Sequence, residues 1–131
     1  TGELCAVVEH YRIPSAFVPV GVQAPCGQPM AEGEVRRAGA FRVTAFSTPG
    51  HSAAHNCYLV ALDGAGSGAS VLVSGDLIFA GSAGGGYFCP KTLHANLRRV
   101  LEILPPDTVI APGHGPLTSV ENELRFNPFL A

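Results

Sequence analysis

The sequence has 131 residues, a mass of 13.5 kDa and a formal net charge of −2, with eight Lys and Arg against ten Asp and Glu. This length suits a single domain, residues 1–131, which buries about two-thirds of its unfolded surface and needs neither disulfide nor metal to fold. The near-neutral charge excludes the basic surface of a nucleic-acid-binding protein. No apolar run approaches the roughly 20 residues of a membrane span, so we expect no membrane insertion.

The four cysteines, Cys5, Cys26, Cys57 and Cys89, are spread along the chain without a C-x-x-C pair. This spacing indicates neither a zinc knuckle nor a redox dithiol. We therefore expect free, mostly buried thiols and a cytoplasmic location, where thiols stay reduced. Sixteen Gly and eleven Pro residues favour turns and short strands.

The N-terminal third predicts a helix, a strand and a loop in that order. Residues 3–11 place apolar side chains at helical spacing, and Pro14 prevents the helix from continuing. The short apolar run 16–20 fits a strand. Residues 21–33 contain three Gly and two Pro, which predict an irregular loop.

The central third predicts strands. Apolar and polar residues alternate over 41–48, the pattern of a strand with one buried face, and Pro49-Gly50 ends it. Two β-rich runs, 57–62 and 70–74, are joined by the glycine-rich segment 63–68. They predict an antiparallel hairpin.

The C-terminal third contains the clearest helix. Segment 81–86 holds four glycines and predicts a loop. After Pro90, five apolar residues form one helical stripe: Leu93, Leu97, Val100, Leu101 and Leu104. Residues 108–111 predict a buried strand. Thr118 and Glu121 have the spacing of a capping box, which predicts a last helix that runs to Asn127-Pro128.

Three residues that can bind metal, His51, Asp76 and His114, each follow a predicted strand through a turn that contains glycine. If these strands lie side by side, two imidazoles and one carboxylate converge at one edge of a sheet. Rigid turns would fix them with the accuracy that metal coordination demands. This ligand set occurs in zinc hydrolases and in non-haem iron oxygenases.

The remaining histidines do not match this context. His55 lies four residues after His51, but the intervening residues do not predict a helix, so we interpret it as a structural or supporting residue. His10 and His94 lie on polar faces of predicted helices and are expected at the surface. No G-x-S-x-G motif occurs, so covalent catalysis by a serine is not indicated.

Four segments together resemble the metallo-β-lactamase superfamily of hydrolases, in particular its glyoxalase II-like branch. They are Thr48-Pro49-Gly50-His51-Ser52, Ser74-Gly75-Asp76-Leu77-Ile78-Phe79-Ala80-Gly81-Ser82, Pro112-Gly113-His114-Gly115-Pro116, and Glu121-Asn122-Glu123 with Asn127-Pro128-Phe129.

The resemblance implies an α+β fold, the αββα sandwich, with the site along the edges of its sheets. It also implies that His51 and His114 are metal ligands and that Asp76 is a catalytic residue that bridges two metals. The implied cofactor is zinc, one or two ions, with iron or manganese as alternatives.

One family motif is absent. Members carry H-x-H-x-D-H upstream of the first of these ligands, whereas this chain opens on Thr1-Gly2, residues that commonly follow that motif. The resemblance therefore implies the C-terminal half of the domain, mainly its C-terminal β-sheet and helix layer. Three ligands cannot hold two ions securely, so we expect little hydrolase activity from the isolated chain. An exposed apolar sheet face would predict a complementary N-terminal half or self-association.

The substrate-binding segment also differs from the family. Relatives usually have Gly-Arg-Thr-Asp after the Gly-Ser that follows the bridging Asp, whereas this chain has Ala83-Gly84-Gly85-Gly86-Tyr87. We expect Tyr87 and these glycines to shape the pocket for a small-molecule substrate. The predicted reaction is hydrolysis of a thioester or related ester by a metal-bound hydroxide. The alternatives are a mononuclear iron enzyme that oxidises a persulfide and a non-catalytic half-domain that serves as an interaction module.

Overall fold

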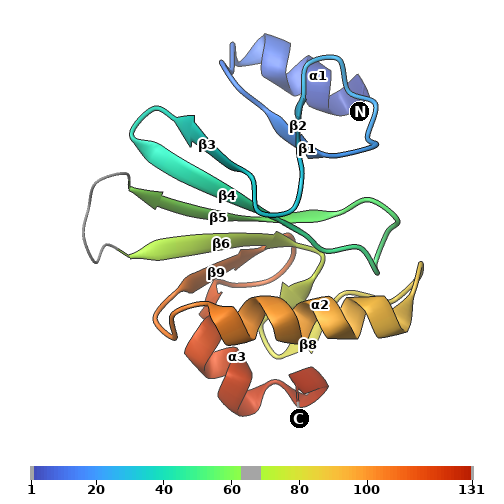
Figure 1. The fold of residues 1–131 in the computed structure, drawn as a ribbon, viewed down its shortest axis with the longest axis vertical. Helices are drawn as coiled ribbons and strands as arrows, with labels where there is room; N and C mark the ends of the chain where they lie inside the picture. Colours follow the sequence, from blue (N-terminus) through green and yellow to red (C-terminus); the bar gives the residue numbers. More distant parts are fainter. Residues whose placement is uncertain (1, 63–68, 131) are drawn as a thin grey trace.

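The computed structural model describes residues 2–62 and 69–130, which form a mixed six-stranded sheet, helices and two small two-stranded sheets (Figure 1). This arrangement confirms the predicted α+β class. The elements are α1 (Gly2–His10), β1 (Phe17–Pro19), β2 (Gln28–Met30), β3 (Val35–Ala38), β4 (Phe41–Ser47), β5 (Asn56–Leu62), β6 (Ser70–Gly75), β7 (Ile78–Phe79), β8 (Ser82–Ala83), α2 (Pro90–Ile103), β9 (Val109–Pro112), β10 (Thr118–Ser119), α3 (Val120–Phe126) and the 3₁₀ helix η1 (Pro128–Leu130).

The main sheet has the strand order β10-β9-β6-β5-β4-β3. The neighbours from β3 to β6 are antiparallel, and β6 and β9 are parallel. It follows that β4, β6 and β9 run in the same direction, so their carboxyl ends lie at the same edge of the sheet. The predicted hairpin of β5 and β6 is confirmed. The predicted connection at 63–68 lies outside the described residues.

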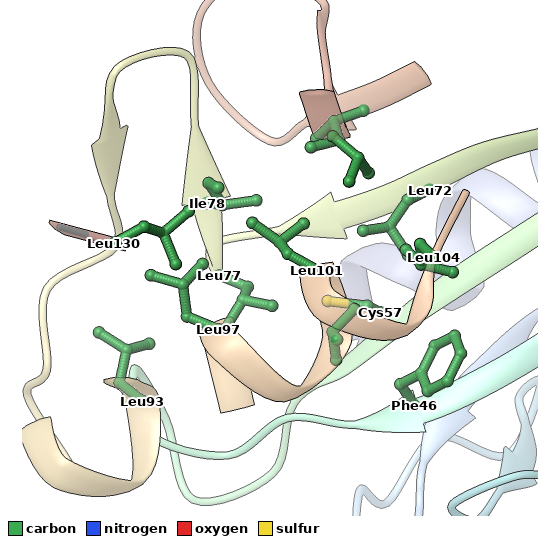
Figure 2. Close-up of a cluster of buried hydrophobic side chains, with 13 residues drawn as sticks. Phe46, Cys57, Leu72, Leu77, Ile78, Leu93, Leu97, Leu101, Leu104 and Leu130 are labelled. Atoms are coloured by element: carbon green, nitrogen blue, oxygen red, sulfur yellow. The ribbon is translucent and has the colours of Figure 1, made fainter. Parts of the chain in front are cut away.

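Helix α2 closes one face of this sheet (Figure 2). Its stripe of Leu93, Leu97, Val100 and Leu101 is buried, as the 3.6-residue period predicts. Proline occupies the first helical position, where its missing N–H costs nothing. The stripe packs on the sheet residues Phe46, Cys57, Leu72 and Ile110.

The opposite face of the sheet is only partly covered. A small buried cluster of Met30, Val43 and Ala45 lies there, with Tyr58 and Val60 packed against it. The register pairs Phe41 with Leu62 and Tyr58 with Val73, which places these side chains on the same face. Phe41, Leu62 and Val73 remain 47%, 50% and 42% exposed there. An apolar strip is therefore open to solvent on this side.

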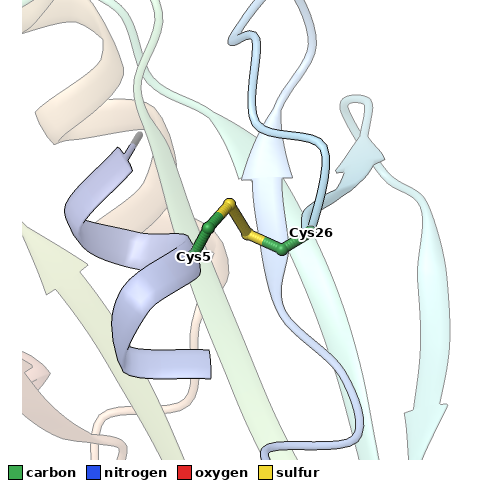
Figure 3. Close-up of a disulfide and its surroundings, with 2 residues drawn as sticks. All are labelled: Cys5 and Cys26. Carbon is green, nitrogen blue, oxygen red and sulfur yellow. A yellow bond between two sulfur atoms is a disulfide. The ribbon is translucent and has the colours of Figure 1, made fainter. Parts of the chain in front are cut away.

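The N-terminal helix is attached by a disulfide between Cys5 and Cys26 (Figure 3). The prediction that these two cysteines are free was wrong. The segment 21–33, predicted as an irregular loop, contains strand β2, which pairs in parallel with β1. The folding of this segment brings Cys26 to α1, a long-range contact that Cys spacing does not encode. Disulfides are typical of oxidising compartments, and the cytoplasmic location stays a prediction.

Two other local predictions differ from the structure. The last helix is capped by Ser119, whose hydroxyl accepts a hydrogen bond from the Asn122 N–H, rather than by Thr118. Strand β3 was not predicted, because its two consecutive arginines hide the alternating pattern of an edge strand. No helix in the described ranges has the length and apolar character that crossing a bilayer requires.

The two remaining thiols have different environments. Cys57 is fully buried, and burial raises its pKa to about 12. Cys89 is partly exposed at the start of α2, and the hydrogen bond that the Thr92 hydroxyl donates to its sulfur lowers its pKa. The thiolate is the reactive form, so the two side chains should differ strongly in reactivity.

Replacement of Leu101 by Ala should lower the free energy of unfolding by about 2–5 kcal/mol, because it leaves a cavity in the main core. The matched control is Ile103→Ala on the exposed face of the same helix, which should change it by about 0.5 kcal/mol or less. Urea denaturation with the disulfide intact measures both. Equal losses in the two variants would contradict the described packing of α2.

Thiol titration at pH 8 without reductant should detect Cys89 alone in the folded protein. After unfolding in guanidinium chloride without reductant, both Cys57 and Cys89 should react, since burial no longer protects Cys57. Cys89→Ser, the control, should remove the fast-reacting thiol and leave the slow one. Four reactive thiols in the unfolded, unreduced protein would contradict the disulfide.

Candidate functional site

The structure brings together the three residues predicted as metal ligands. His51 follows β4, Asp76 follows β6 and His114 follows β9, at the common edge of the sheet. The His51 Nε2 atom lies 3.4 Å from Asp76 Oδ2, and the His114 Nε2 atom lies 3.4 Å from Asp76 Oδ1. The carboxylate thus stands between two imidazoles, with one oxygen facing each ring.

The 3.4 Å separations fit a donor set for metal better than a pair of direct hydrogen bonds. Charge-assisted N–H···O bonds are usually about 2.7–2.9 Å long. Two atoms that bind one zinc ion at tetrahedral geometry lie roughly 3.3–3.6 Å apart. Within the described ranges, no three His, Cys, Asp or Glu side chains surround a single metal position. The three side chains form a row, His51, Asp76 and His114, in which both histidines share the Asp76 carboxylate. Their chemistry suits metal binding, but the row contains only three ligand side chains.

The orientation of His51 is fixed by the glycine-rich segment. Its Nδ1 lies 2.9 Å from the carbonyl oxygen of Gly85. Because a carbonyl only accepts, Nδ1 carries the proton, and Nε2 is the nitrogen that faces Asp76. Histidines that bind metals commonly donate their other ring N–H in this way. The Tyr87 ring meets the His51 ring edge-on at 5.3 Å and is 84% exposed.

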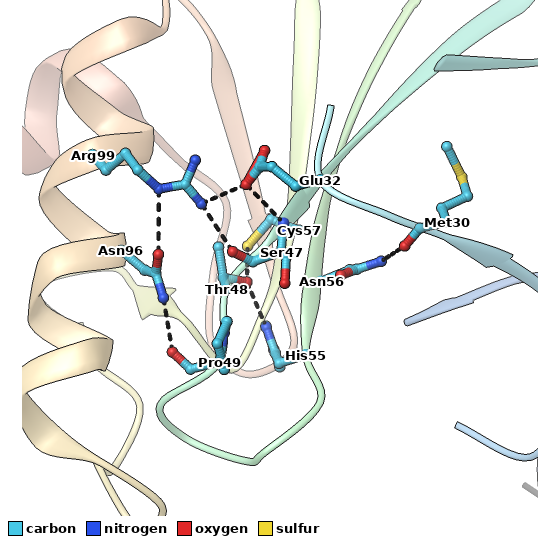
Figure 4. Close-up of polar contacts among 10 residues, drawn as sticks. All are labelled: Met30, Glu32, Ser47, Thr48, Pro49, His55, Asn56, Cys57, Asn96 and Arg99. Carbon is cyan, nitrogen blue, oxygen red and sulfur yellow. Dashed lines mark hydrogen bonds and ion pairs between the residues drawn. The ribbon is translucent and has the colours of Figure 1, made fainter. Parts of the chain in front are cut away.

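The turn before His51 is held by α2 (Figure 4). Arg99 donates to the carbonyl of Ser47 at 2.8 Å, and Asn96 donates to the carbonyl of Pro49 at 2.9 Å. Gly50 has a φ of 145° and packs on the backbone of Leu93, so a side chain at this position would collide with α2. The helix therefore sets the position at which the chain enters the site.

His55 connects the two strands that carry His51 and Asp76. Its Nε2 accepts the backbone N–H of Asp76 at 3.1 Å, so its Nδ1 carries the proton and donates to the Thr48 hydroxyl at 2.8 Å (Figure 4). Burial lowers the pKa of His55, and the Asp76 charge opposes that shift. Both ring nitrogens are thus engaged, and the interpretation of His55 as a supporting residue is confirmed.

His114 is the most exposed of the three residues. Its ring contacts the Phe79 ring edge-on at 5.6 Å. The turn before it is joined to the Asp76 turn by a hydrogen bond from the Gly113 N–H to the Gly75 carbonyl, 2.8 Å long. Phe79, Asn96 and Arg99 were not predicted, since apolar and helical patterns account for them without any site.

The other predicted positions lie around or outside this site. His94 is exposed and accepts a hydrogen bond from Arg98, and His10 is exposed on α1. A cavity of about 380 Å³ lies beside Gly84, Gly85 and Gly86 and is otherwise lined by Ala83, Pro90, Leu93, His94, Leu97 and Phe129. A larger cavity, about 600 Å³, lies between α1 and Cys26 and contains none of the three candidate ligands.

No family model matches the sequence. The chain is 36% identical over 97 residues to the probable metallo-hydrolase YqgX of Bacillus subtilis, covering 70% of this chain and 42% of that protein. It is 31% identical over 105 residues to the hydroxyacylglutathione hydrolase GloC of Haemophilus influenzae, covering 76% of this chain and 45% of that protein. The chain thus spans about half the length of these curated relatives.

Solved structures share the fold over nearly the whole chain. The B3 metallo-β-lactamase BLEG-1 superposes with a TM-score of 0.74 at 27% identity, over 97% of this chain and 69% of that one. TTHA1623, whose crystal structure is a di-iron-bound form, superposes with a TM-score of 0.69 at 32% identity, over 98% of this chain and 71% of that one.

Replacement of Thr48 by Val should lower the free energy of unfolding by about 1–3 kcal/mol, because the N–H of the His55 ring loses its buried partner. Thr48→Ser keeps the hydroxyl and should cost less. Denaturant unfolding measures stability, and ¹⁵N NMR of the imidazole reports the tautomer. A native His55 ring protonated on Nε2 would contradict the described hydrogen bonds.

Proposed function

Because the chain belongs to the metallo-β-lactamase superfamily, we propose that it carries part of the metal site of a hydrolase that acts on a thioester or related ester. The observation that carries this proposal is the Asp76 carboxylate held between two imidazole Nε2 atoms, each 3.4 Å from one of its oxygens. The relative named as a hydroxyacylglutathione hydrolase supports the substrate class.

In this proposal His51, Asp76 and His114 would hold the metal, with His51 and His114 on either side of the shared Asp76 carboxylate. Zinc, when bound, polarises a carbonyl and lowers the pKa of a coordinated water to about 7. The chain's own residues fix the donors. The Gly85 carbonyl orients the His51 ring, and the Asp76 backbone is held by His55. The charge of the Asp76 carboxylate balances part of the metal charge.

We also propose that Tyr87 contacts the substrate. Its ring packs against His51 and is mostly exposed, so its hydroxyl is free to approach a bound molecule from solvent. The cavity beside Gly84–Gly86 is mainly apolar and lies next to the same segment. This cavity suits a small apolar group of the substrate better than a charged group, because His94 is the one titratable side chain in its lining.

The identity of the metal is part of the proposal. Zinc is the first choice, and the di-iron form of a relative at 32% identity makes iron the alternative. An iron site is also what the second candidate, oxidation of a persulfide, requires. Elemental analysis of protein purified without added metal distinguishes the two, because zinc favours hydrolysis and iron favours oxygen chemistry.

A further part of the proposal is that catalysis needs donors beyond the three present. Tetrahedral sites take four ligands per ion, and the described row offers three side chains for two ions. We propose that a complementary segment, which carries further donors, covers the open sheet face at Phe41, Leu62 and Val73 and completes the site.

Zinc titration by calorimetry should show weak binding to the chain. His51→Gln, Asp76→Asn and His114→Gln should each weaken the zinc affinity by about 10-fold or more, because each removes one of three donors. His94→Gln, which removes an imidazole outside the row, is the matched control and should bind as the native chain does. Equal zinc affinity in all four variants would refute the assignment.

Hydrolysis of thioester and ester substrates should be near the uncatalysed rate for the chain alone. Co-refolding with a polypeptide that carries the H-x-H-x-D-H segment should produce hydrolysis that a chelator abolishes. The Asp76→Asn variant in the same mixture should lose that activity. If the completed protein binds zinc and hydrolyses none of these substrates, the proposed reaction is wrong although the metal site stands.

A further inference from the structure

We propose that the buried pair Glu123 and Asn127 is a positioning device for the candidate metal site, acting through the turn of the β7–β8 hairpin. The expected effect on zinc affinity rests on the proposed function, whereas the expected effect on the two imidazoles does not. Both residues come from the C-terminal motif that the sequence comparison with the family singled out and that the proposed reaction does not use.

The two side chains converge on one turn. Glu123 and Asn127 are each 4% exposed and lie one helical turn apart on and just after α3. Glu123 Oε1 accepts the Gly81 N–H at 2.8 Å and the Asn127 side-chain N–H at 2.8 Å. Asn127 also donates to the Ser82 carbonyl at 3.0 Å. The pair thus binds backbone groups of two consecutive residues, Gly81 in the turn and Ser82 at the start of β8.

Packing alone does not account for a carboxylate at this position. A buried charge is costly unless it is fully hydrogen-bonded, and an apolar residue would fill the same space at lower cost. Glu123 Oε2 accepts the Thr118 hydroxyl at 2.6 Å, so both oxygens are satisfied. The carboxylate is therefore used to hold particular donors, one of which is the backbone N–H of Gly81.

The hairpin that this turn closes contacts His114, and the residues directly before and after the hairpin include Asp76 and the contact of His51. Asp76 lies two residues before β7. Phe79, in β7, places its ring against His114 at 5.6 Å. After β8, the Gly85 carbonyl accepts the Nδ1–H of His51 at 2.9 Å. A shift of the hairpin would thus move the neighbours of both imidazoles together.

The buried side chain of Ile78 packs β7 on the main core, and Ser74 donates to the Ile78 carbonyl at 3.1 Å. The hairpin's own hydrogen bonds are too few to fix its two ends. Each strand has two residues, and an isolated two-stranded hairpin is marginally stable in water. Its far end is held where Gly84 donates to the Leu77 carbonyl at 3.3 Å and packs directly on the Asp76 carbonyl, where a side chain would collide. The turn end is held by Glu123 and Asn127. The two anchors together fix Phe79 and Gly85 relative to Asp76.

The test compares Glu123→Leu with Glu123→Gln and with Glu121→Leu, an exposed position on the same helix, in the metal-free chain. In Glu123→Leu we expect faster hydrogen exchange at the Gly81 amide, faster solvent exchange of the His51 Nδ1 proton and a changed shift of the His114 ring. Zinc affinity should fall about 10-fold. Glu123→Gln should keep most of these signals as in the native chain, since its amide oxygen still accepts the Gly81 N–H. Glu121→Leu should leave them unchanged.

A purely structural role predicts a different pattern. If Glu123→Leu lowers the thermal midpoint but leaves the His51 and His114 signals and the zinc affinity as in the native chain, the inference is wrong. Should that variant fail to fold, Asn127→Ala, which removes the bond to the Ser82 carbonyl, is measured in the same way and decides the question. If the native chain binds no zinc, the proposed function fails, while the imidazole signals still test the positioning role.

Discussion

The shared direction of β4, β6 and β9 is the constraint on which the candidate site depends. A chain that leaves three strands at the same sheet edge must turn there three times, so residues far apart in sequence become neighbours. Strand β5 lies between β4 and β6 and runs the opposite way. His55, just before β5, therefore falls at the same edge and joins Thr48 to the backbone of Asp76. One topological fact thus places the three candidate ligands and their main support.

Each candidate ligand is held by groups outside its own turn. The His51 turn is fixed by α2 through Asn96 and Arg99, and the His51 ring by the carbonyl of Gly85. Backbone carbonyls, those of Ser47, Pro49 and Gly85, are the acceptors in these three contacts. The dependence on α2 also explains why Gly50 is needed, because the backbone there approaches Leu93 too closely for any side chain.

Local patterns predicted what depends on local chemistry. The stripe of α2, the β5–β6 hairpin and the strand-end position of His51, Asp76 and His114 follow from periodicity and turn residues, and the resemblance to the family is confirmed. The disulfide and the role of Glu123 were not predicted, because each depends on segments distant in sequence meeting in the fold. Strand β3 was missed because Arg36 occupies the half-buried face of this edge strand next to Arg37, so apolar and polar residues do not alternate along it.

The main core and the candidate site are separate parts of the molecule. The cluster under α2 contains none of the three candidate ligands, and its apolar side chains are buried without any contribution from metal. The chain can therefore fold while its donor row is incomplete. The apolar strip on the opposite face is open because the main core covers only one side of the sheet. A sheet packed on one side alone exposes apolar strand residues such as Val73 on the other. Stability thus comes from the covered face, and the three candidate ligands lie outside that core at the edge of the sheet.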